Sequence, residues 1–63
     1  MPMTGKQLLK LAKSNGWQLV RVTGSHHRLK HEETGRKVTI AVHANKDIPK
    51  GTEQKILKDL GLR

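Results

Sequence analysis

The spacing of the apolar residues changes twice along this 63-residue chain, and that change limits the folds open to it. Between Thr4 and Lys13 the leucines fall on one side of a helix and the lysines fall on the other. From Trp17 to Val42 the residues follow the two-residue period and β-branched composition of strands. A helical spacing returns after Pro49. The predicted order is therefore helix, strands, helix.

Capping signals bound the two predicted helices. Thr4 is the expected N-cap of the first, and Gln7 stands at the capping-box spacing behind it. Asn15-Gly16 ends that helix with residues that tolerate a left-handed conformation. Thr52 is the expected N-cap of the second helix, which Gly61 ends. Between the helices, three strands are expected over residues 17–23, 26–32 and 37–42, followed by an irregular stretch over 43–50.

These elements predict an α+β domain, in which a three-stranded antiparallel sheet carries both helices on one face. The other face of the sheet would remain in water. We expect one domain over residues 1–63, with a small aliphatic core, since the chain has one Trp and no Phe or Tyr. The residues expected in that core are Leu8, Leu9, Leu29, Val38, Ile40, Ile56 and Leu60.

The charge of the chain indicates a polyanionic partner. Lys and Arg number 13 against five Asp and Glu, which gives a formal net charge of +8. Cysteine is absent, so neither disulfides nor thiolate metal sites are available. No apolar run approaches the roughly 20 residues that cross a bilayer. We therefore expect a cytoplasmic protein that binds nucleic acid, RNA in particular, and no membrane.

The segment Gly24-Ser25-His26-His27 holds the main candidates for chemistry. Histidine is suited to proton transfer because its unperturbed pKa of ~6.5 lies near neutrality. Alternation along a strand places His26 with Arg28 on the polar face, and His27 with Leu29 on the inner one. His26 is therefore the first catalytic candidate. His27 remains the second, because a bulge at Gly24-Ser25 would exchange the two faces.

The remaining histidines predict little chemistry of their own. His43 begins the stretch after the third strand and could approach the first two strands as a second proton-transfer group. Adjacent histidines on a strand point to opposite faces, and His27 and His31 would lie ~13 Å apart at ~3.3 Å per residue. We expect neither a metal site nor a cofactor. Trp17, at the start of a strand, is expected to anchor the core rather than to stack on RNA bases.

Several fragments, in this order and spacing, resemble the HicA toxin family over nearly the full length. They are Gly16-Trp17, Arg21-x-x-Gly24-Ser25-His26, His31, Val38-Thr39-Ile40-x-x-His43, Asp47-Ile48-Pro49-Lys50-Gly51-Thr52 and Ile56-Leu57-x-x-Leu60-Gly61-Leu62. The resemblance implies a fold like that of double-stranded-RNA-binding domains and ribosome-independent cleavage of mRNA. It also implies one active histidine at the start of the second strand, and a HicB-type antitoxin that masks it. That histidine corresponds to His26, or to His27 where the family places it one residue later.

The resulting hypothesis is a sequence-relaxed endoribonuclease, monomeric when free, acting as the toxin of a toxin–antitoxin pair. His26 or His27 would take the proton of the RNA 2′-hydroxyl. The expected RNA-binding residues are Arg21, Ser25, Arg28, Lys30 and Lys37. Two alternatives stay open. One is a non-catalytic double-stranded-RNA-binding module, disfavoured because Glu53 in the first turn of the second helix would repel phosphate. The other is an interaction protein whose basic surface answers an acidic partner.

Overall fold

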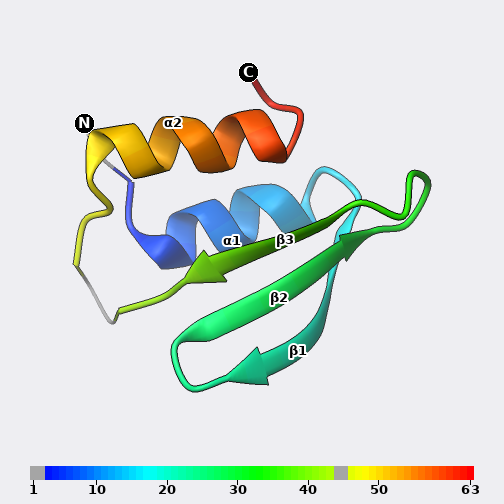
Figure 1. Cartoon of the computed structure of the whole chain (residues 1–63), viewed down its shortest axis with the longest axis horizontal. Helices are drawn as coiled ribbons and strands as arrows, with labels where there is room; N and C mark the ends of the chain where they lie inside the picture. The colour runs from blue at the N-terminus through cyan, green and yellow to red at the C-terminus, as the bar shows by residue number, and fades with distance from the viewer. Residues whose placement is uncertain (1–2, 44–45) are drawn as a thin grey trace.

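The computed structural model of the chain describes residues 3–43 and 46–63 and confirms the predicted order of elements (Figure 1). The elements are α1 (Gly5–Lys13), β1 (Trp17–Thr23), β2 (His26–His31), β3 (Lys37–Ala41) and α2 (Lys50–Asp59). Both helices lie on one side of the sheet, as expected for an α+β fold of this order. Part of the predicted irregular stretch, residues 44–45, lies outside the described residues. Neither helix in the described ranges has the length and apolar character that crossing a membrane requires.

The three strands form one antiparallel sheet in the order β1-β2-β3. The pairing of β2 with β3 is regular from His26 opposite Ala41 to Lys30 opposite Lys37. The pairing of β1 with β2 shifts between Leu19 and Arg21, so one residue of β1 is extra, as in a β-bulge. Gly24 and Ser25 form the two-residue loop between β1 and β2, with Gly24 at a φ of 58°. Because the bulge is in β1 and not in this loop, the predicted faces of His26 and His27 are kept.

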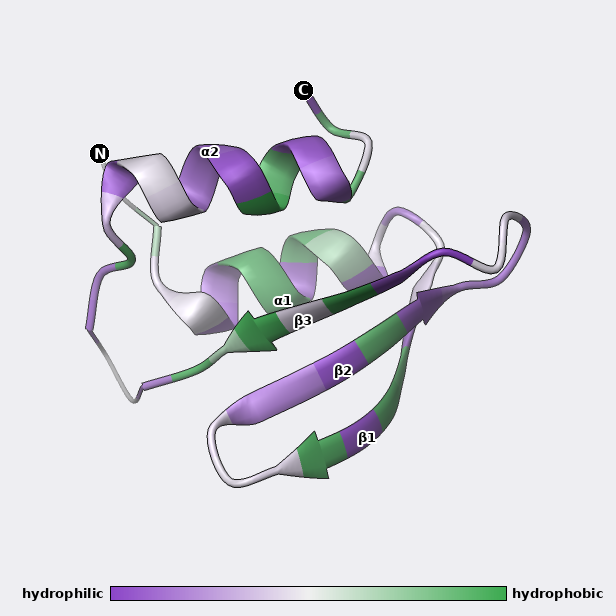
Figure 2. Ribbon diagram, viewed as in Figure 1, coloured by the Kyte–Doolittle hydropathy of each residue, from purple (hydrophilic) through white to green (hydrophobic). Residues whose placement is uncertain are grey.

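The core lies between the inner face of the sheet and the two helices. Its buried residues are Leu8, Ala12, Trp17, Leu29, Val38, Ile40, Ile48, Ile56 and Leu60. The prediction is confirmed for six of its seven residues, and Leu9 is only partly buried at the edge of the cluster. Trp17 is a core anchor as predicted, and its indole N–H donates to the Leu60 carbonyl at 3.3 Å. Figure 2 shows the apolar positions of α1 and β3 close together, whereas α2 is largely polar.

The start of each helix tests the capping predictions separately. The capping box between Thr4 and Gln7 is present at α1. The expected N-cap Thr52 is wrong, because α2 begins at Lys50 and its N-cap is Pro49. The cause is tertiary: the Ile48 N–H donates to the Met3 carbonyl at 2.8 Å, which fixes the chain just before Pro49. The helix then starts from this anchored point, three residues earlier than an N-cap at Thr52 would allow.

Candidate functional site

The open face of the sheet carries two cross-strand rows of side chains at its β1–β2 loop end. The first row consists of Thr23, His26 and Ala41, and the second of Arg21, Arg28 and Thr39. Side chains directly opposite on antiparallel strands have Cβ atoms about 4.5–5.5 Å apart, so the members of each row are neighbours. Arg21, Thr23, His26, Arg28 and Thr39 together line a hollow of about 280 Å³. An exposed imidazole and two guanidinium groups therefore share one surface depression.

Arg21 reaches this face only because β1 carries the bulge. With Trp17 inward, strict alternation along a regular strand would also turn Arg21 inward. The extra residue, Val20, shifts the alternation of side chains between the two faces by one position. Arg21 therefore lies on the open face, opposite Arg28. The sequence holds a signal of this bulge that pattern reasoning missed. The polar residues Gln18 and Arg21 are three apart, whereas Arg21 and Thr23 are two apart.

The two predicted lysines lie farther along the same face. Lys30 is opposite Lys37, and both side chains are exposed. Lys30 is four residues from His26 along β2, a separation of ~13 Å at ~3.3 Å per residue. The structure thus brings Arg21 and Arg28 close to His26, and places Lys30 and Lys37 farther along the same face.

The four histidines divide into two pairs by their hydrogen bonds. The ring Nδ1 of His27 lies 3.1 Å from the Ser25 carbonyl oxygen, so it donates its proton there. The ring Nδ1 of His31 accepts from the backbone N–H groups of Glu33 and Thr34, at 3.2 and 3.4 Å. Within the described residues, no protein group is hydrogen-bonded to the imidazole of His26 or of His43. Two imidazoles therefore hold local backbone, and two are available to a ligand.

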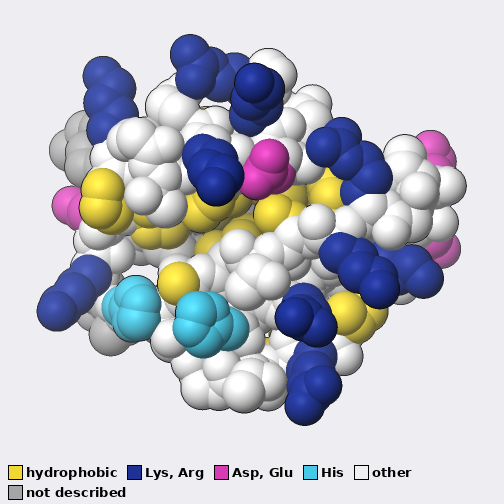
Figure 3. All heavy atoms as spheres, viewed as in Figure 1, with side chains coloured by type: hydrophobic (Ala, Val, Ile, Leu, Met, Phe, Trp, Pro, Cys, Tyr) yellow, Lys and Arg dark blue, Asp and Glu magenta, His cyan; other side chains and the backbone are white. Residues whose placement is uncertain are grey.

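A second, larger hollow runs between β3 and α2 and meets the first one at His26 and Thr39. Its volume is about 610 Å³, within the range of small-molecule sites. Val38, Ile48 and Ile56 provide an apolar floor. Figure 3 shows apolar side chains along this groove, basic side chains on both of its sides and two histidines near one end. We call this hollow the β3–α2 groove.

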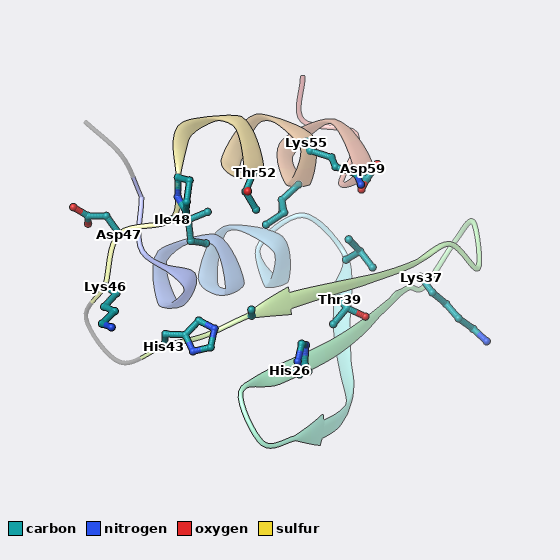
Figure 4. A pocket seen from close by; sticks show the side chains of 14 residues that line it. His26, Lys37, Thr39, His43, Lys46, Asp47, Ile48, Thr52, Lys55 and Asp59 are labelled. Atoms are coloured by element: carbon teal, nitrogen blue, oxygen red, sulfur yellow. The ribbon is translucent and has the colours of Figure 1, made fainter.

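Charged and hydrogen-bonding side chains of the groove come from segments far apart in the sequence. In Figure 4, His26 and His43 border the same hollow. The side chains of Lys55 and Asp59 project from α2, and that of Lys37 projects from β3. Sequence reasoning did not predict this groove, because only the packing of α2 beside β3 creates it. The described residues contain no group of three or more His, Cys, Asp or Glu side chains placed to hold a metal ion.

Ser25 lies in the predicted loop between β1 and β2, and Glu53 lies in the first turn of α2, as expected from the sequence. Ser25 is half-buried in the loop, and its carbonyl accepts from the Val42 N–H at 2.8 Å as well as from His27. Its backbone thus ties the β1–β2 loop to the end of β3. Glu53 is buried, and its carboxylate accepts from the Met3 N–H at 3.1 Å. Glu53 thus lies in the first turn of α2 as expected, but its carboxylate is turned into the protein, away from a phosphate bound at the start of the helix.

A family model described as HicA toxin of bacterial toxin-antitoxin matches residues 5–62. No curated protein matches the chain. The matched range contains every strand and helix, and both hollows around His26.

Proposed function

Because the chain belongs to the HicA family of toxins from bacterial toxin–antitoxin systems, we propose that it is an endoribonuclease that cleaves mRNA without the ribosome. The observation that carries this proposal is the exposed imidazole of His26 beside Arg21 and Arg28 on the open sheet face. RNA supplies both features that such a surface needs: a phosphate for the cations, and a 2′-hydroxyl that a base can activate.

In the proposed reaction, His26 takes the proton of the 2′-hydroxyl, and the 2′-oxygen attacks the adjacent phosphorus. Arg21 and Arg28 neutralise the phosphate and the charge that builds on its oxygens in the transition state. Lys30 and Lys37 hold the next phosphates, while Ser25 keeps the loop before His26 in place and borders the RNA. A positioned base of this kind contributes about 10²–10⁴-fold to the rate.

The choice of His26 over His27 follows from where the two rings lie. His27 stands opposite Ile40 on the inner face and donates to the Ser25 carbonyl, so its ring is engaged in the fold. His26 stands on the face that carries the arginines, and its side chain is exposed. The geometry therefore supports His26 as the proton acceptor and His27 as a residue that holds the loop.

A HicB-type antitoxin is the proposed partner. Neutralising the toxin requires that His26 and the arginines around it be covered, and a net charge of +8 favours an acidic covering surface. Free toxin is proposed to be monomeric. Binding of the antitoxin and of RNA should then exclude each other.

Cleavage assays on purified protein test the catalytic assignment. His26→Ala should lower the rate of RNA cleavage by about 10²–10⁴-fold, the share of one positioned acid–base group. His27→Ala, once circular dichroism shows that the variant is folded, should cleave RNA at a rate within a few-fold of that of the parent. If His26→Ala cleaves as fast as the parent, the assignment is wrong. If the two variants exchange these results, His27 is the base.

Salt dependence of binding tests the phosphate contacts apart from catalysis. With His26→Ala as an inactive background, the logarithm of the affinity for single-stranded RNA should fall linearly with the logarithm of the salt concentration. Adding Arg21→Ala should reduce that slope by ~0.7, the value of one phosphate contact. Lys13→Ala, an exposed lysine at the end of α1, is the matched control and should leave the slope unchanged.

A double-stranded-RNA-binding module is the second candidate, and the burial of Glu53 favours it. The start of α2 carries no solvent-facing carboxylate from Glu53 that would repel a phosphate. This candidate predicts binding to duplex RNA with no cleavage by the parent protein after long incubation. Cleavage of single-stranded RNA by the parent that depends on His26 would exclude it.

A further inference from the structure

We propose that His43 is a second catalytic residue, which protonates the leaving oxygen while His26 deprotonates the 2′-hydroxyl. This inference rests on the proposed nuclease function and adds to it a partner for His26. Its first support is sheet register. His26 is opposite Ala41, and the ladder continues one residue further through the Val42 N–H to the Ser25 carbonyl at 2.8 Å. His43 is thus two residues beyond the partner of His26.

Two residues along a strand return the side chain to the same face. His43 therefore stands diagonally across from His26 on the open face, a relation that places residues about 7–8 Å apart. The side chain that lies between them on this face of the sheet is that of Ala41, and its single methyl group leaves room above the sheet. Both imidazoles line the β3–α2 groove, and Figure 4 shows them bordering the same hollow. A phosphate placed over Ala41 would be flanked by both rings.

The second support is chemical availability. His27 and His31 each have their ring Nδ1 bonded to backbone groups. His26 and His43 are the two histidines whose rings have no such bond among the described residues, and they are the two that share a cavity. The other charged groups of that cavity are Lys37, Lys46, Asp47, Lys55 and Asp59. An imidazole pair beside lysines suits a phosphodiester better than it suits a cation.

The step balances without any further reactant. His26 accepts the 2′-hydroxyl proton as the bond from the 2′-oxygen to phosphorus forms. The bond from phosphorus to the 5′-oxygen breaks, and protonated His43 gives its proton to that oxygen. The products are a 2′,3′-cyclic phosphate and a free 5′-hydroxyl. Afterwards the two imidazoles have exchanged protonation states, and proton exchange with water restores them.

A leaving-group comparison tests this role. The substrates are one RNA oligonucleotide containing a site that the parent cleaves, and the same oligonucleotide with sulfur in place of the 5′-bridging oxygen there. A thiolate leaves without a proton, so it does not need the general acid. His43→Ala should lose about 10²-fold or more on the oxygen substrate. It should stay within about tenfold of the parent on the sulfur substrate. His26→Ala should lower the cleavage rate on both substrates.

Controls separate this role from a structural one. Lys46→Ala removes an exposed cation from the same stretch and the same groove, and it should change the two substrates by equal factors. Equal losses on both substrates for His43→Ala, or no loss on either, would overturn the proposal. If the parent cleaves no RNA at all, so that no such substrate can be chosen, the nuclease proposal itself fails, and this inference fails with it. His43→Gln, which keeps a polar side chain, should behave like His43→Ala.

Discussion

The same substitution, Gly to Ala, should have opposite effects in the first turns of the two helices. At Gly5 a Cβ would lie 2.6 Å from the Ala41 carbonyl oxygen and 2.9 Å from the Val42 Cα. Both of these atoms belong to backbone, so no side-chain rotation can relieve the contact. Reaching the 3.4 Å of ordinary contact requires α1 and the end of β3 to separate by about 0.8 Å. At Gly51 nothing lies within 4 Å of the added Cβ.

The expected change in the free energy of unfolding is the sum of two opposing contributions. Alanine is favoured over glycine in a helix by about 0.5–1 kcal/mol, which applies at both sites. Overpacking costs about 1–3 kcal/mol, with the upper part expected at Gly5 because backbone must move. Gly5→Ala should therefore lower the free energy of unfolding by about 1–2 kcal/mol, and Gly51→Ala should raise it by about 0.5–1 kcal/mol. For a domain of this size, 1 kcal/mol corresponds to about 4–8 °C in Tm.

Urea and thermal unfolding followed by circular dichroism measure both variants against the parent. The loss at Gly5 is a large fraction of the total, since a 63-residue domain has about 3–9 kcal/mol of stability in all. The reasoning is refuted if Gly5→Ala is as stable as the parent or more stable. A destabilised Gly51→Ala would show that helix propensity does not set the sign at the open site. Equal shifts at the two positions would show that the close approach of α1 to β3 has no energetic consequence.

Two further predictions concern the sheet. Deleting Val20 should leave a regular β1 with Arg21 still opposite Arg28, so the salt slope of RNA binding should match that of the parent. Deleting Val22 should instead absorb the bulge and turn Arg21 inward, reducing that slope by ~0.7; identical slopes for the two deletions would contradict the assigned bulge. Trp17→Phe keeps a buried ring but leaves the Leu60 carbonyl without its indole donor. The free energy of unfolding of Trp17→Phe, measured in urea, should fall by more than the roughly 0.5–1.5 kcal/mol of the bond, because buried ring atoms are lost as well. An unchanged value would mean that neither the bond nor these atoms contribute stability.

Local alternation along a strand predicts part of the site, and contacts between distant segments decide the rest. Alternation within β2 correctly separated His26 from His27, because face assignment within one regular strand needs only the two-residue period. The same reasoning could not assign Arg21, since a bulge in β1 changes the parity and its sequence signal is one irregular spacing. The residue type of Thr52 predicts a cap at that position. The observed start at Lys50 depends on a bond between Met3 and Ile48, 45 positions apart in the chain.

The sequence by itself determined the order of the elements, the start of α1, the core role of Trp17 and the basic character of the surface. These depend on local periodicity, caps and composition, which neighbouring residues specify among themselves. Only the tertiary structure decided that Arg21 joins Arg28, that α2 lies beside β3 to form a groove, and that His26 and His43 border it together. These contacts depend on strand register and on helix packing between segments that are distant in the sequence. A shift of one residue in register would send each of these side chains to the opposite face.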